Sequence, residues 1–110
     1  MEIIRQYGIN GDKKKLYNLT QVQDGSLAEM LGQRIEIKAY VLYGSTNSNG
    51  EPIQIFRAET DEGKIIGTVS PAFIRGLTDY LDCMESDELT EFEVVSRTSK
   101  QGRKYIVFKA

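Results

Sequence analysis

With 110 residues, of which 40% are apolar, the chain can form one small core and has the length of a single domain. Its formal net charge of −2 argues against a protein that coats nucleic acid through overall charge, although a local basic groove stays compatible with it. The absence of histidine excludes most hydrolytic triads and the usual catalytic zinc sites, whereas the 16 carboxylates leave a magnesium site possible in principle. Because no catalytic constellation is recognisable, we predict no enzymatic activity, no metal and no cofactor.

The first 32 residues predict an N-terminal arm that packs on the main part of the fold. Residues 1–12 contain two glycines and little periodicity, which is typical of a loose segment. We interpret Lys13–Thr20 as a short strand. Gln23–Ser26 predicts a turn, because aspartate and glycine tolerate turn dihedral angles.

One helical turn is predicted between residues 26 and 32. Ser26 is a suitable N-cap, Glu29 follows three residues later as in a capping box, and Gly32 ends the turn. The main domain, residues 33–110, begins directly after it.

Alternation of apolar and polar side chains is clearest in Gln33–Tyr43, which predicts a half-buried strand. The face expected to be buried carries Ile35, Ile37, Ala39 and Val41, and the outward face carries Arg34, Glu36, Lys38 and Tyr40. Tyr43 is in phase with the buried face. A β-bulge, which is common in barrel strands, would turn this ring outward.

Two further strands are predicted to form a hairpin. The polar loop 44–50 ends in Asn-Gly, a strong turn signal, and Pro52–Thr60 follows as the second strand. Asp61–Gly63 predicts a tight turn into the third strand, Lys64–Ser70. We expect Phe56 to lie in the core.

From Ser70 onward, the spacing of the apolar residues changes from two to three or four. Ser70 is a favourable N-cap and proline suits the first helical position, so a helix is predicted over Pro71–Met84. Its apolar stripe consists of Phe73, Ile74, Leu77, Tyr80, Leu81 and Met84. Gly76 weakens a helix by about 1 kcal/mol relative to alanine, so packing must hold this one. We predict that Cys83, the lone cysteine, is a small core residue.

The last two strands are predicted over Thr90–Arg97 and Arg103–Lys109, joined by the turn Thr98–Gly102. The side chains expected to face the core are Phe92, Val94, Ile106 and Phe108. Tyr105 alternates with these residues and therefore lies on an outward face.

Three strands, a helix and two strands follow each other in the chain order of the five-stranded OB-fold Greek-key barrel. We therefore predict a mainly β fold, with this barrel over residues 33–110, the helix between its third and fourth strands, and an N-terminal extension. Such barrels bind oligonucleotides across the face of strands 2 and 3 and through their strand 1–2 and 4–5 loops. The order of elements predicts a fold and does not by itself establish a function.

Charges are segregated in the C-terminal third. Carboxylates dominate residues 85–93, whereas residues 94–110 contain no acidic side chain. The bases of this last segment are Arg97, Lys100, Arg103, Lys104 and Lys109. The pattern indicates either a loop that binds phosphates or a solvated hairpin whose charges protect a sheet edge.

Tyrosines lie between lysine and arginine residues on two of the predicted strands. Tyr40 shares an outward face with Lys38, and Tyr105 shares one with Arg103. Bases of single strands stack on such rings for about 1–3 kcal/mol each, while cations follow the phosphates. Each ring could instead be an amphipathic side chain at the rim of the barrel. The predicted nucleic-acid-binding residues are Lys38, Tyr40, Tyr43, Arg57, Arg97, Lys100, Arg103, Lys104 and Tyr105.

Several short stretches support this interpretation by their order and spacing. They are Ala39–Tyr43, Ile55–Ala58, Asp61–Lys64 with Val69 and Ser70, Glu91–Val95 and Thr98–Gly102. In these stretches the chain resembles the single-stranded-DNA-binding proteins of small Bacillus phages that replicate by protein priming. The resemblance implies an OB fold, a role in coating displaced strands during replication, stacking by Tyr43, and a place in the cytoplasm of a bacterial host.

We therefore predict a single-stranded-DNA-binding protein with little sequence preference. Besides DNA, the expected partners are a second copy, through free strand edges, or replication proteins. An OB-fold protein-interaction module, acting as adaptor or inhibitor of a host protein, is the alternative that the acidic residues 85–93 favour. No apolar run is long enough for a membrane span, and the first residues do not show the pattern of a secretory signal. With the lone cysteine, which fits a reducing compartment, these observations lead us to expect a cytoplasmic protein.

Overall fold

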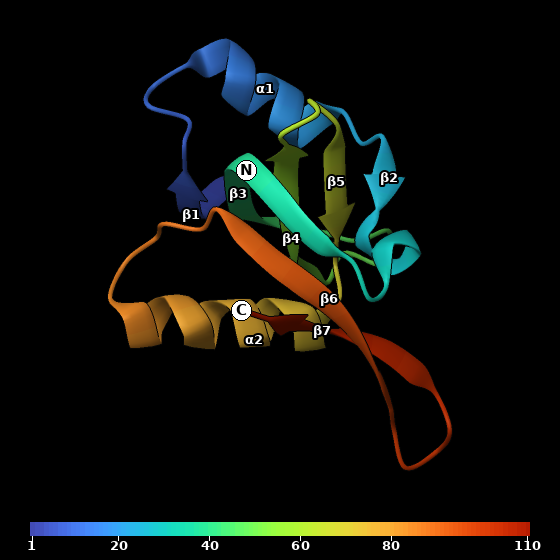
Figure 1. Cartoon of the computed structure of the whole chain (residues 1–110). Coiled ribbons are helices and arrows are strands. Elements are labelled where there is room, and N and C mark those ends of the chain that lie inside the picture. The colour runs from blue at the N-terminus through green and yellow to red at the C-terminus, as the bar shows by residue number, and fades with distance from the viewer.

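The computed structural model describes residues 1–110 and shows a mainly β fold around one curled, mixed sheet that forms a half-barrel (Figure 1). In chain order the elements are β1 (Glu2–Tyr7), α1 (Lys13–Gln21), β2 (Gly25–Ser26), the short 3-10 helix η1 (Leu27–Met30), β3 (Arg34–Thr46), β4 (Pro52–Thr60), β5 (Ile65–Thr68), α2 (Pro71–Met84), β6 (Glu91–Thr98) and β7 (Lys104–Lys109). Strands follow the order β2-β5-β4-β3-β6-β7, and all pairs are antiparallel except β2–β5.

Strand β3 is the element to which most of the sheet is attached. One edge pairs with β4, from Ile37 opposite Thr60 to Thr46 opposite Pro52. The other edge is divided between two strands, since Arg34–Glu36 pair with β6 and Tyr40–Gly44 pair with β1. The 13 residues of this strand therefore connect the N-terminal segment with the C-terminal hairpin.

A β-bulge at Lys38 changes the face on which the following side chains lie. Ile37 is opposite Thr60 and Ala39 is opposite Glu59, so one extra residue stands in β3 between them. Ile35, Ile37, Tyr40 and Leu42 consequently share the concave face, and Ala39, Val41 and Tyr43 share the convex face. The prediction that strict alternation puts Ala39 and Val41 beside Ile35, and Tyr40 outward, is wrong for this reason.

The main core lies between the concave face and α2. Its 16 buried residues include an aromatic group in which Phe56, Phe73 and Phe92 lie with ring centroids 5.6–6.0 Å apart. Phe108 and Tyr80 are partly buried and pack against this group at the α2–β7 contact. The core position predicted for Phe56 is confirmed, and Phe108 packs at the edge of this core.

Helix α2 begins and ends at the predicted residues. Ser70 caps it by accepting a hydrogen bond from the Phe73 amide at 3.3 Å, and Pro71 is its first residue. At Gly76 a Cβ would lie 3.3 Å from Cβ of Phe108, so glycine permits the close approach of helix and β7. Cys83 is exposed, because it falls off the buried stripe of α2, and its predicted core position is wrong.

A second, smaller core lies on the convex face under α1. It consists of Ile9, Leu19, Ala39, Val41, Tyr43 and Ile65, with Ile3, Leu16 and Ile55 against it. Asp12 caps α1 by accepting hydrogen bonds from the amides of Lys14 and Lys15. Leu16, Leu19 and Thr20 are spaced three and four residues apart and face the sheet, so this segment is a helix and the predicted strand over Lys13–Thr20 is wrong.

The start of the chain is an ordered strand and not the predicted loose segment. β1 pairs with β3, and its Tyr7 ring lies 6.5 Å from that of Tyr40. Arg5 forms ion pairs with Asp82 and Asp87, which attach β1 to the end of α2. The capping box of Ser26 and Glu29 forms as expected, although the turn is a 3-10 helix.

Gly8 lies where the N-terminal segment crosses the bulge of β3, and substitutions at this position test how tightly the two pack. Both Gly8 and Gly11 have φ of +77°, but a Cβ at Gly8 would collide with the Lys38 carbonyl oxygen, whereas Gly11 has open space. We expect Gly8→Ala to lower the free energy of unfolding by about 3 kcal/mol and Gly11→Ala by about 1 kcal/mol. Urea unfolding measures both; equal losses would show that Gly8 supplies only its backbone conformation.

Candidate functional site

The structure distributes the nine predicted binding residues over four separate places. Tyr40 and Tyr43 are buried, with 0% and 5% of their surface exposed. Lys38 is exposed in the bulge of β3, and Arg57 is half-buried on the convex face. The remaining residues lie together on the β6–β7 hairpin, and they are Arg97, Lys100, Arg103, Lys104 and Tyr105. The predicted residues therefore do not converge on one channel.

The two buried tyrosines connect parts of the fold. The Tyr40 hydroxyl donates a hydrogen bond of 2.7 Å to the carbonyl oxygen of Asp87, and burial followed by the charge of Asp87 raises the pKa of this phenol well above its usual value. The Tyr43 hydroxyl donates to the carbonyl oxygen of Thr20 at 3.4 Å, beneath α1. The bulge does put Tyr43 on the convex face, but α1 covers it there, so the prediction that these rings stack bases is wrong.

Arg57 holds the end of α1 against β4. Its Nη1 donates a hydrogen bond of 3.1 Å to the carbonyl oxygen of Val22, and its Nε is buried without a partner. Gly67 on β5 makes room for it, since a Cβ there would lie 2.7 Å from Cδ of Arg57. A second link is the ion pair between Lys15 and Glu59 at 3.8 Å. The Arg57 guanidinium therefore attaches α1 to the convex face and is not available to bind a phosphate.

The β6–β7 hairpin extends beyond the sheet as a two-stranded ribbon (Figure 1, orange to red). Pairing of β6 with β3 stops at Glu93, while pairing of β6 with β7 continues to Thr98 opposite Lys104. We call residues 95–105 the ribbon. Its turn is closed by hydrogen bonds between Ser99 and Arg103, with the Ser99 amide donating to the Arg103 carbonyl at 2.8 Å.

One face of the ribbon combines an aromatic ring with cations. Arg97 is directly opposite Tyr105 across the strands, and alternation along the chain puts Arg103 on the same face. Tyr105 is 40% exposed, and none of the ribbon's bases forms an ion pair. Lys100 lies in the turn and Lys104 is on the opposite face. The ribbon can thus offer a stacking surface and unneutralised positive charge.

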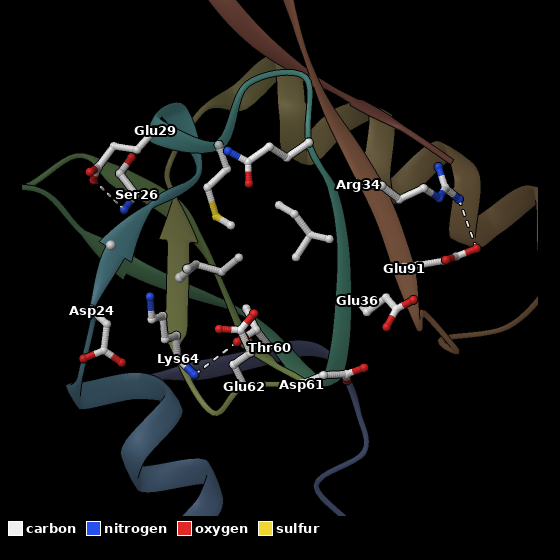
Figure 2. A pocket seen from close by; sticks show the side chains of 15 residues that line it. Asp24, Ser26, Glu29, Arg34, Glu36, Thr60, Asp61, Glu62, Lys64 and Glu91 are labelled. Atoms are coloured by element: carbon white, nitrogen blue, oxygen red, sulfur yellow. Dashed lines mark hydrogen bonds and ion pairs between the residues drawn. The ribbon is translucent and has the colours of Figure 1, made fainter.

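A cleft of about 750 Å³ lies between β2–η1, the β4–β5 turn and the start of β3, where β3 pairs with β6. Its apolar residues are Met30, Ile35 and Ile66. Its acidic residues are Asp24, Glu29, Glu36, Asp61, Glu62 and Glu91, against only Arg34 and Lys64 as bases. Figure 2 shows these charged side chains around the rim, and we call this site the acidic cleft.

Some of the carboxylates in the acidic cleft have local partners and others do not. Glu29 accepts from the Ser26 amide, Asp24 accepts from the Ile65 amide, and Glu91 pairs with Arg34 at 3.2 Å. Glu36, Asp61 and Glu62 form no ion pair. These carboxylates do not form a group that could hold a metal ion.

Like charges crowd around Glu36. It is directly opposite Glu91 in the β3–β6 pair, and the Asp61 amide donates to its backbone carbonyl at 3.1 Å, which brings the two side chains together. Contact with Asp61, by hydrogen bonding and then by charge, raises the pKa of Glu36, and burial and Glu91 add to the shift. The sequence predicted only that Glu36 lies on an outward strand face, because its meeting with Asp61 and Glu91 depends on the pairing of β3 with β4 and with β6.

The raised pKa of Glu36 predicts that the stability of the fold depends on pH. Folded protein holds the Glu36 proton more tightly than unfolded protein, so this group's contribution to stability decreases as pH rises from about 4.5 through the folded pKa. We expect Glu36→Gln to unfold at a higher temperature than wild type at pH 7 and at about the same temperature as wild type at pH 4. Thermal melts check this, with Glu51→Gln as an exposed control; a lower midpoint at pH 7 contradicts it.

Comparison with protein-family models, curated proteins and solved structures finds no match to this chain. None of the helices has the length and hydrophobicity needed to cross a bilayer. Function therefore has to be inferred from the chemistry of the ribbon and the acidic cleft.

Proposed function

We propose that the protein binds single-stranded nucleic acid, with little sequence preference, through the ribbon. The observation that carries this proposal is the exposed Tyr105 between Arg97 and Arg103 on a ribbon without acidic side chains. Bases would stack on the ring, which accepts any base because every base has a π-face. The arginines, with Lys100 and Lys104, would neutralise phosphates and release condensed counterions.

We further interpret the fold as a partly open OB barrel. β3, β4 and β5, then α2, then β6 and β7 follow that order, and the ribbon turn corresponds to its strand 4–5 loop. Two features differ from a fully closed barrel: β5 pairs with β2 and not with β7, and α1 covers the convex side of β3 and β4. The interface that we propose is therefore shifted from the strand 2–3 face to the loop.

The resemblance to phage single-stranded-DNA-binding proteins agrees with this interpretation. On that basis the protein would coat displaced strands during replication in the cytoplasm of a bacterial host. Stacking and phosphate contacts serve single-stranded DNA and RNA alike.

Fluorescence anisotropy with labelled oligo-dT at about 50 mM salt tests the binding proposal. We expect Tyr105→Ala to weaken binding about 10-fold, because it removes one stacked base. Tyr17→Ala is the matched control, since Tyr17 is 65% exposed on α1, away from the ribbon, and this variant should bind within about 2-fold of wild type. Absence of wild-type binding, or an equal loss in both variants, contradicts the proposal.

The salt dependence gives an independent measurement of the phosphate contacts. On single strands the slope of log K against log salt is about −0.7 per phosphate neutralised. Arg97→Ala/Arg103→Ala should make the slope shallower by about 1.4, whereas Lys13→Ala/Lys14→Ala on α1 should leave it unchanged. A slope that does not change in the ribbon variant would contradict the assignment of these arginines.

A protein-interaction module is the second candidate, and the acidic cleft favours it. A concave site rich in carboxylates repels phosphates and suits a basic segment of a protein. A pull-down that retains a protein after nuclease treatment, from a chain that binds no oligonucleotide, would support this candidate over the first.

A further inference from the structure

Two oppositely charged surfaces of this chain lack partners of their own. The ribbon carries Arg97, Lys100, Arg103 and Lys104 with no acidic side chain among residues 95–105, and none of these bases is in an ion pair. The acidic cleft has six carboxylates and two bases, one of which is already paired with Glu91. The two surfaces are complementary in charge.

The ribbon cannot reach the acidic cleft of its own chain. Its base is held beside the cleft, since the Gly32 amide donates to the Val94 carbonyl oxygen at 2.8 Å and Arg34 pairs with Glu91. From this base the two strands run away from the rest of the molecule (Figure 1), and continuous pairing from Glu93 to Thr98 keeps them together along that length. Only another molecule can bring a basic ribbon to this cleft.

We propose that the ribbon of one copy of this chain docks into the acidic cleft of a second copy. An incoming guanidinium or ammonium group would lie among Glu36, Asp61 and Glu62, which have no ion-pair partner, and would relieve their mutual repulsion. The apolar side chains of Met30, Ile35 and Ile66 suit the methylene stem of an arginine or lysine. Figure 2 shows the opening through which it would enter.

This contact joins two different surfaces and is therefore head-to-tail. Each added copy leaves the assembly with one free ribbon at one end and one free cleft at the other. Assembly therefore continues into a ring or an open row, unlike the closed pair that a two-fold contact forms. A ribbon tip buries little area, and contacts below about 1,200 Å² are weak and transient. The association is consequently expected to need high protein concentration and low salt.

The proposal is independent of nucleic-acid binding but shares one surface with it. Nucleic acid bound along the ribbon would cover the lysine and arginine side chains that enter the cleft, so its addition should dissociate the assembly. The acidic cleft takes no part in nucleic-acid binding, and variants in it separate the two proposals.

Sedimentation velocity at about 25 mM salt, over a range of protein concentration, tests the docking. The ribbon variant is Arg103→Glu/Lys104→Glu, and the cleft variant is Glu36→Lys/Glu62→Lys. We expect wild type to form species larger than a dimer, which dissociate at about 500 mM salt, and each variant alone to stay monomeric. A 1:1 mixture of the two variants should assemble again, because the unchanged ribbon fits the unchanged cleft and the charge-reversed ribbon fits the charge-reversed cleft.

The control Glu85→Lys/Glu88→Lys changes the net charge as much as the cleft variant does, but outside the acidic cleft, and should assemble like wild type. Circular dichroism shows whether each variant is folded. A monomeric wild type, a mixture that stays monomeric, or assembly lost equally in the control overturns the proposal. Oligo-dT binding retained by the cleft variant, with assembly lost, shows that the two functions are separate; assembly without any oligo-dT binding rejects only the nucleic-acid proposal.

Discussion

The extra residue at Lys38 in β3 determines what each face of the sheet can bury. Before the bulge, Ile35 and Ile37 face the concave core, and after it Tyr40 and Leu42 take over that face. The same shift moves Ala39, Val41 and Tyr43 to the convex face, where a second apolar surface results. Because this surface needs a cover, the N-terminal segment folds over it, and Gly8 lacks a Cβ where that segment crosses the bulge.

The N-terminal segment is therefore part of the fold and also limits where a ligand can bind. α1 is attached to the convex face by Arg57, by the Lys15–Glu59 ion pair and by the Tyr43 hydrogen bond. β1 is attached to α2 through Arg5. With the convex side of β3 and β4 covered, the ribbon and the acidic cleft remain as the two surfaces on which charged side chains lack ion-pair partners.

These two surfaces explain how a chain with a net charge of −2 can present a strongly basic element. Positive charge is concentrated on a ribbon that leaves the body, and negative charge is concentrated in a cleft beside its base. Separation of this kind supports nucleic-acid binding by the ribbon and association between copies through the cleft. It also costs stability locally, because Glu36 lies against Asp61 and opposite Glu91.

Local sequence patterns were sufficient for much of the fold. Periodicity and capping chemistry act over a few residues and were enough to predict the bounds of β4 and α2 and the capping box at Ser26. They also predicted that Phe92, Val94 and Ile106 face the core. The segregation of charge that defines the ribbon was likewise visible in residues 94–110.

Tertiary structure alone decided the orientation of Tyr40 and Tyr43, the role of Arg57 and the existence of the acidic cleft. A single added residue reverses the face of every side chain after it, and alternation in one strand does not show where that residue stands. Whether Lys13–Thr20 is a strand or a helix depends on an apolar surface made by β3, β4 and β5, and the carboxylates of the cleft meet only when those strands pair. These features depend on contacts between distant residues, which a local pattern does not contain.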